Sequence, residues 1–280
     1  TTRGNDSMLK RLACIFSVVA LSLSPTLAEA DVDTPPKAVD GVLDLSDWDF
    51  DSMGTVPLEG EWDFWWQELV DPPRIFTDPE PPSANVTFDV PNLWNKVETP
   101  SGSSLYTANG FGTFLLRIKL PPQQRDTLGL YIHSADLAYE LYGMRGEAPL
   151  PSMSNGVVGT DEDSEIPRYL PKLITIPESA SDEITLVWHL SSHRHIRGGP
   201  RNAPIIGLER DLSDSLMSKR LRDMGLIGVL LIMGLYHFAI FTLRRKDRAP
   251  LWFGCLCVVM ALRQIFTSSF VELFDSAPST

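Results

Sequence analysis

Two long apolar runs in the last quarter of the chain predict helices that cross a membrane. Residues 224–243 contain no formal charge, and a helix of that length spans the hydrocarbon core of a bilayer. A second apolar run covers residues 249–266 and is interrupted only by Arg263. The five residues 244–248 between the runs include four Lys or Arg. The pattern therefore predicts a helical hairpin around a basic turn.

Residues 41–212 have a different pattern, in which short stretches alternate apolar and polar side chains. Residues 113–120 are the clearest case, since Phe114, Leu116 and Ile118 share one face with a period of two that a helix does not use. Further strands are predicted at 42–45, 48–50, 61–66, 128–133, 137–142, 173–176 and 183–190, with Gly- or Pro-rich breaks between them. Such spacing predicts a mainly β fold, a jelly-roll-like two-sheet sandwich followed by transmembrane α-helices, with residues 213–223 as a juxtamembrane linker.

The N-terminal residues have the pattern of a secretory signal peptide. Residues 8–30 contain a basic start, an apolar stretch and the small-residue site Ala28-Glu29-Ala30, so cleavage is expected after Ala30. An uncleaved anchor helix is the alternative, but twelve apolar residues are short for a span. Residues 1–7 read as upstream sequence and residues 31–40 as a flexible lead-in.

Charge divides the chain and limits its partners. Residues 31–210 hold thirteen Lys or Arg against twenty-eight Asp or Glu, while residues 211–280 hold eight against six. The acidic part should be repelled by phosphate backbones, so nucleic acid is not expected as a partner, whereas the lipid bilayer is. The three cysteines lie in apolar stretches outside residues 41–212, which leaves that domain without a disulfide framework.

The distribution of basic residues predicts the orientation. Residues 267–280 contain no Lys or Arg, so the basic turn 244–248 is expected in the cytoplasm and residues 267–280 in an exported loop. The signal peptide independently exports the segment that follows it. The predicted location is the inner (cytoplasmic) membrane, with residues 31–223 on the periplasmic side.

Several short stretches occur together in a fixed order along the chain. They are PLEGEWDFW (57–65), GFGTF (110–114), GVVGT (156–160) with PRY (167–169), HRHIRGG (193–199), GLYH (234–237), LRRKDR (243–248) and LWFG (251–254). The first five resemble the extracellular type 2 domain of the bacterial seven-transmembrane receptors with diverse intracellular signalling modules, and the last three resemble the start of the seven-helix region of that family.

The resemblance implies a jelly-roll sensory domain, similar to carbohydrate-binding modules, joined through a helix bundle to a cytoplasmic output domain. A diguanylate cyclase or a histidine kinase is the output expected first. Two stretches depart from the family pattern. Residues 143–146 stand where relatives have an Asn-Gly hairpin turn, and Ser191-Ser192 stand where a Ser-Asn pair is usual. A homodimer is left open.

Candidate ligand-binding residues fall in two groups. The first is the pair Trp65 and Trp66, because neighbouring strand residues point to opposite faces and one of the two rings should lie outside the core that holds the other. The second is a basic segment in an acidic domain, with Arg168 and Tyr169 from another loop; it comprises His193, Arg194, His195, Arg197 and Arg201. The alternative is that these cations pair with a solvated acidic turn at 160–165 and brace the sandwich.

The sequence predicts no metal site, no cofactor and no catalytic centre. His193 and His195 have a ligand spacing, but neither a cysteine nor a third histidine accompanies them. The sequence lacks the nucleophile, phosphate-loop and zinc-protease motifs, so an enzyme is not expected from these residues. The leading hypothesis is the input part of a membrane receptor that senses a small-molecule or carbohydrate-like ligand. The alternative is a membrane-tethered carbohydrate-binding or accessory module without signalling.

Overall fold

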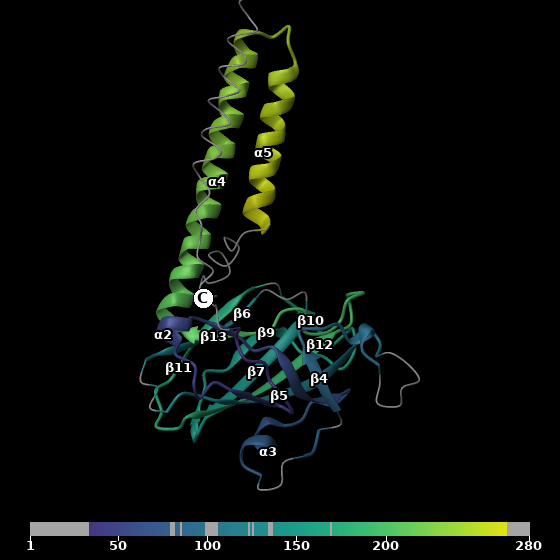
Figure 1. Ribbon diagram of the computed structural model, residues 1–280. Coiled ribbons are helices and arrows are strands. Elements are labelled where there is room, and N and C mark those ends of the chain that lie inside the picture. Colours follow the sequence, from purple (N-terminus) through teal and green to yellow (C-terminus); the bar gives the residue numbers. More distant parts are fainter. Residues whose placement is uncertain are drawn as a thin grey trace, which may run out of the picture. The chain divides into compact units, whose positions relative to one another are not determined.

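The computed structural model describes residues 34–78, 82–84, 86–98, 106–122, 124, 126–133, 137–168 and 170–267. The predicted signal peptide 8–30, residues 1–7 and most of the loop 267–280 that is predicted to be exported lie outside the described residues. The described part is a β-sandwich followed by two antiparallel helices that pack side by side (Figure 1). The predicted fold class, mainly β followed by apolar helices, is confirmed.

The larger sheet has the strand order β10-β9-β7-β12-β5-β3-β4, with β1 parallel to β5 and β8 paired with β7. The smaller sheet has the order β11-β6-β13-β2. The strands are β1 (Val42–Asp44), β2 (Val56–Pro57), β3 (Gly60–Trp66), β4 (Val86–Val90), β5 (Gly110–Lys119), β6 (Leu128–Ile132), β7 (Ala138–Arg145), β8 (Ala148–Pro149), β9 (Met153–Val157), β10 (Ile166–Pro167), β11 (Lys172–Ile176), β12 (Glu183–Ser192) and β13 (Ile205–Leu208).

The main core lies between the two sheets and is built from the side chains that point inward from their strands. Phe114 and Trp188 stand opposite each other in the antiparallel register of β5 and β12, and the Trp188 ring also contacts Trp62. A second apolar cluster covers the outer face of the larger sheet, where Leu115 and Val187 pack under helix α3 (Pro72–Phe76) and the chain around it. Part of the larger sheet is therefore buried on both faces.

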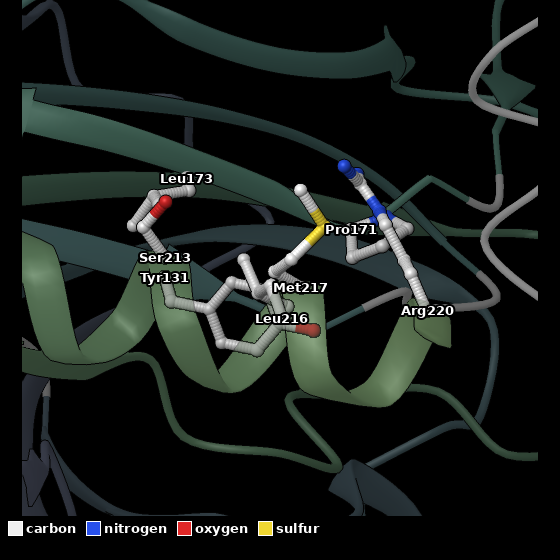
Figure 2. Close-up of a pocket in the computed structure, with 7 residues that line it drawn as sticks. All are labelled: Tyr131, Pro171, Leu173, Ser213, Leu216, Met217 and Arg220. Atoms are coloured by element: carbon white, nitrogen blue, oxygen red, sulfur yellow. The ribbon is translucent and has the colours of Figure 1, made fainter. Parts of the chain in front are cut away.

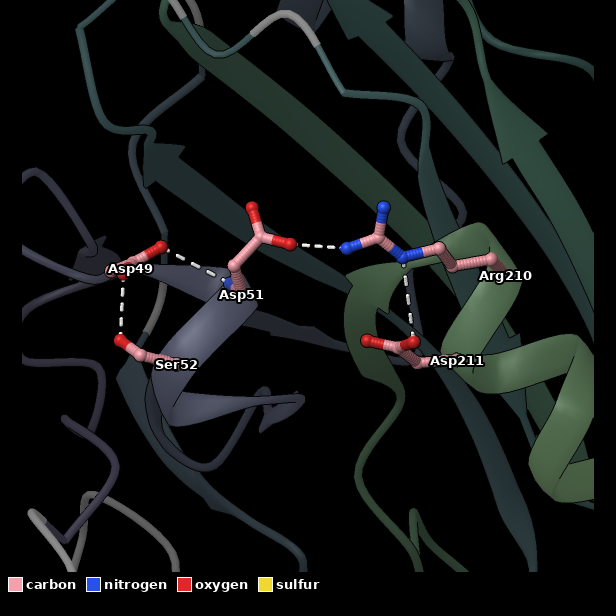
Figure 3. Close-up of polar contacts among 5 residues, drawn as sticks. All are labelled: Asp49, Asp51, Ser52, Arg210 and Asp211. Atoms are coloured by element: carbon pink, nitrogen blue, oxygen red, sulfur yellow. Dashed lines mark hydrogen bonds and ion pairs between the residues drawn. The ribbon is translucent and has the colours of Figure 1, made fainter.

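Residues 48–50 were predicted as a strand, and this prediction is wrong. Asp49 caps helix α2 (Phe50–Met53), since its carboxylate accepts from the backbone NH of Asp51 at 3.1 Å and from the Ser52 hydroxyl at 2.6 Å (Figure 3). These hydrogen bonds hold the pKa of Asp49 below its ordinary value. As a helix N-cap, the Asp49 carboxylate satisfies a backbone NH group of the first turn, which has no partner inside the helix.

Strand β7 is longer than predicted and runs through residues 143–145. The turn to β8 falls on Gly146, whose φ of 61° suits glycine. Arg145, at the end of the strand, is 1% exposed and donates to the carbonyls of Ser181, Pro177 and Gln124. The departure from the family pattern at 143–146 thus contains a buried arginine that holds two loops together.

Two helices follow the sandwich, α4 (Glu209–Leu243) and α5 (Ala249–Thr267), and both are long and apolar enough to cross a membrane. They approach closely at Gly234 and Gly254, where a side chain on Gly254 would meet the Phe238 ring at 2.7 Å. The His237 ring lies 4.4 Å from that of Phe253. Helix α4 also includes residues 213–223, which the sequence analysis assigned to a linker.

Strand β13 runs directly into helix α4, since Leu208 ends the strand and Glu209 begins the helix. Leu212, 6% exposed, packs over Gly129 of β6, where an added Cβ would lie 3.1 Å from its Cδ1. An ion pair between Arg210 and Asp51 links α4 to α2 on the surface (Figure 3). The first turns of the helix are therefore part of the sandwich.

Candidate functional site

The first half of the basic segment 191–201 is anchored by a buried carboxylate. Glu165 is 1% exposed and accepts from the Ser191 hydroxyl at 3.0 Å and from the backbone NH of His193 at 2.9 Å. The Ser191 hydroxyl oxygen in turn accepts from the backbone NH of Gly159 at 3.1 Å. The expectation of a solvated acidic turn at 160–165 is therefore wrong for Glu165, although Asp161 to Ser164 are exposed.

The side chains of this first half also reach the acidic turn. A ring nitrogen of His193 lies 3.2 Å from the carbonyl oxygen of Gly159. The Arg194 guanidinium donates to the backbone carbonyl of Glu162 at 3.0 Å. These contacts support the bracing role that the sequence analysis kept as its alternative for His193 and Arg194.

The second half of the segment packs against the loop that follows β4. The backbone NH groups of Trp94 and Asn92 donate to the carbonyls of Gly198 and Pro200, at 3.0 and 2.9 Å. A Cβ on Gly198 would lie 1.8 Å from the carbonyl oxygen of Ala108, and Gly199 has a φ of 109°. Glycine is required at both positions, which explains the Gly-Gly pair.

Between these two anchors the segment is open to solvent. Arg197 is exposed, and Ile196 beside it is 87% exposed. His195 and Arg201 are half-buried. Residues 195–201 thus form a positive, partly apolar surface on an otherwise acidic domain, which we call the basic ridge. Such a surface attracts anionic or hydroxyl-bearing groups.

The two adjacent tryptophans point to opposite faces of β3, as predicted. The Trp66 ring packs on the main core 5.0 Å from the rings of both Trp94 and Tyr106. Trp94 lies against Gly198, so Trp66 is one ring away from the basic segment. Trp65 belongs to the outer cluster and donates its indole NH to the Ser83 carbonyl at 3.0 Å. The structure therefore separates Trp65 from the other candidates.

Arg168 is exposed at the end of β10. It pairs with Leu137 in an isolated bridge, and its carbonyl accepts from the Asn155 side chain at 2.9 Å. Tyr169 lies outside the described residues. Among the residues that the structure describes, groups of three His, Cys, Asp or Glu that could hold a metal were not found.

A pocket of about 270 Å³ lies where the sequence analysis placed no site, between the smaller sheet and the first turns of α4 (Figure 2). Apolar walls and an arginine surround it, and part of its lining comes from residues first assigned to the linker. The lining residues are Tyr131, Pro171, Leu173, Ser213, Leu216, Met217 and Arg220. The spacing of Leu212 and Leu216, one helical turn apart, is a sequence signal of helix that the prediction of a linker at 213–223 did not use.

Residues 219–276 match the family described as 7TM diverse intracellular signalling, which confirms the predicted resemblance. The matched residues include the apolar run of α4 and all of α5, which follow the β-sandwich, and the match supports a membrane-embedded receptor. A comparison with curated protein sequences gave no significant match.

Solved structures similar to this chain include glycoside hydrolases. A β-glucuronidase from Ruminococcus gnavus has 14% identity and a TM-score of 0.39, over 55% of this chain and 28% of the enzyme. A GH2 β-galacturonidase from Eisenbergiella tayi bound to galacturonate has 12% identity and a TM-score of 0.34, over 54% of this chain and 24% of the enzyme. The chain spans about a quarter of the length of these enzymes.

Proposed function

We propose that this chain is the input part of a bacterial signal-transduction receptor. In this proposal the sandwich stands on the periplasmic side of the inner membrane, α4 and α5 cross the membrane, and a cytoplasmic output domain such as a diguanylate cyclase or histidine kinase receives the signal. The receptor family match over 219–276 supports the class of protein. The basic turn 244–248 and the acidic sandwich support the orientation.

The observation that carries the proposal is the junction of β13 and α4. A strand of the sandwich becomes a membrane helix without an intervening residue, and Leu212 buries its side chain against β6. A ligand that shifts the smaller sheet would therefore shift the helix, because the two move as one packed body. A tethered accessory module needs only a loose linker, so this junction favours the receptor.

The basic ridge is the proposed ligand site. His195 and Arg197 supply cationic or polar groups between the two anchors, Arg201 follows the second anchor directly, and Trp66 lies close by in the core. A small anionic or hydroxyl-rich molecule, such as a carbohydrate-like ligand, suits these groups. Glu165 holds the ridge in place, and we assign His193 and Arg194 mainly to this bracing.

A binding experiment separates the ligand role from the bracing role. The purified sandwich is screened by thermal unfolding against neutral sugars and sugar acids, first as wild type and then with His195→Ala and Arg197→Ala combined. We expect the double variant to lose the ligand-induced rise in melting temperature while its unliganded melting temperature stays nearly unchanged. A fall of several degrees without ligand would show that the ridge is structural.

Reporter fusions test the orientation. Alkaline phosphatase is active only outside the cytoplasm, so a fusion after Thr280 should be active and a fusion at Lys246 silent. The reverse result would overturn the proposed side of the membrane. A mature N-terminus at Asp31, measured by mass spectrometry, would support export by a cleaved signal peptide.

A further inference from the structure

The junction pocket carries an inference beyond the sensing of a soluble ligand. Figure 2 shows Arg220 beside Pro171 at one end of the pocket and Leu173 with Ser213 toward the other. Tyr131, 7% exposed, forms a wall between these ends. The pocket therefore offers a cation at one end, hydroxyl groups along its length and apolar sides.

In the proposed topology, the position of the pocket along α4 puts the pocket at the membrane surface. Arg220 precedes Met224, the first residue of the uncharged run, by four residues, which is about 6 Å of helix rise. The polar layer on each side of a bilayer is about 5–7 Å thick, so with Met224 at the edge of the hydrocarbon core Arg220 would lie at the level of the lipid phosphates. Ser213 lies about 10 Å further along the helix, beyond the phosphates.

The local charge is unusual for the proposed side of the membrane. Lys219, Arg220 and Arg222 stand within four positions, on the side where short loops generally carry few cations. The sandwich above them is acidic and would be repelled by an anionic bilayer surface. A cluster of cations at this level would offset that repulsion by binding lipid phosphate.

We propose that the junction pocket binds the headgroup of an anionic phospholipid, with the phosphodiester at Arg220 and an uncharged polyol group extending toward Ser213. Arg binds phosphate through paired NH donors, and the hydroxyls of Tyr131 and Ser213 can bond to polyol oxygens. The apolar walls, with Leu216 and Met217 on α4, pack against the carbon atoms. The bound lipid would join the smaller sheet to α4 at the membrane surface. This role of the lipid rests on the proposed receptor function.

The test compares the full chain in two lipid nanodiscs, one of phosphatidylcholine alone and one of phosphatidylcholine and phosphatidylglycerol in equal parts. Tryptophan fluorescence follows thermal unfolding of the sandwich. We expect phosphatidylglycerol to raise the melting temperature by about 2–4 °C, because a ligand that binds only the folded state stabilises it. Arg220→Gln should abolish this rise.

Arg222→Gln is the matched control, since it removes the same charge from an exposed position on the same helix that does not line the pocket. This variant should still show the rise in melting temperature with phosphatidylglycerol. Loss of the rise in both variants would mean that the rise depends on the general charge of the surface, and it would overturn the proposal. Equal melting temperatures of the wild type in the two nanodiscs would also overturn it.

Soluble glycerophosphoglycerol, added to phosphatidylcholine nanodiscs, separates a lipid site from a site for a free anion. An equal rise with this compound would assign the pocket to a soluble ligand and refute the lipid proposal. A nanodisc exposes both membrane surfaces, so the result does not depend on the orientation of the chain. Failure here would leave the receptor proposal standing, while failure of the reporter fusions would not affect the lipid result.

Discussion

Replacing Leu212 tests whether the start of α4 is a structural part of the sandwich. The side chain is 6% exposed and fills the space above Gly129, which lacks a side chain of its own. Truncation of a buried leucine to alanine costs about 2–5 kcal/mol, from lost burial and the cavity left behind. Because Leu212 packs through one face of a helix, we expect the lower part of that range, about 2–3 kcal/mol.

For a domain of this size, that loss corresponds to a fall of about 4–12 °C in the melting temperature. The assay is thermal unfolding of the full chain in phosphatidylcholine nanodiscs, followed by tryptophan fluorescence. Leu221→Ala is the control, since it makes the same change on the same helix at a position that is 60% exposed. It should change stability by less than about 0.5 kcal/mol. Equal effects of the two substitutions would refute the packed junction.

Two further predictions concern buried polar groups. His189 donates its ring NH to the Val70 carbonyl, and burial lowers its pKa, so the folded state keeps the ring neutral. Its contribution to stability is complete above the unfolded pKa of about 6.5 and is lost as the pH falls through the lower folded value, so His189→Gln should flatten the decline in melting temperature on acidification. Glu165→Ala should lower the melting temperature by several degrees, because the Ser191 hydroxyl and a backbone NH lose their acceptor, whereas Glu162→Ala, at an exposed carboxylate, should not.

The hydrophobic pattern was sufficient to predict the long strands and the two long apolar helices. Strands β3, β5 and β12 contain clear stretches of alternation, because each lines the main core with one face, whereas β6 is buried along its whole length. Strands β2, β8 and β10 have two residues each, too few for a period to be seen. Residues 48–50 alternate as a strand does, but the capping bonds of Asp49 favour a helix.

The junction and the anchor of the basic ridge depend on tertiary contacts that sequence patterns do not contain. Residues 213–223 are mostly polar, and their helix is stabilised from both ends, by Leu212 packed on the sandwich and by the membrane run that follows. Glu165 ends a run that also contains Asp161, Glu162 and Asp163, which are exposed as in a solvated turn, and only its bonds to Ser191 and His193 distinguish it. Its burial was therefore missed.

The central claim, that the sandwich and α4 move as one body, is tested most directly by a spin-label distance measurement in nanodiscs. One label is placed at Thr175, exposed on β11, and the other at Ser218, exposed on α4 above the membrane, in a chain whose native cysteines are replaced by alanine. A pair within the sandwich, Thr87 and Thr175, gives the reference width. For the Thr175–Ser218 pair we predict a single distance distribution that is as narrow as the reference. The distribution should become broader only when a Gly-Ser linker is inserted between Leu208 and Glu209. A distribution as broad without the linker as with it would contradict the account.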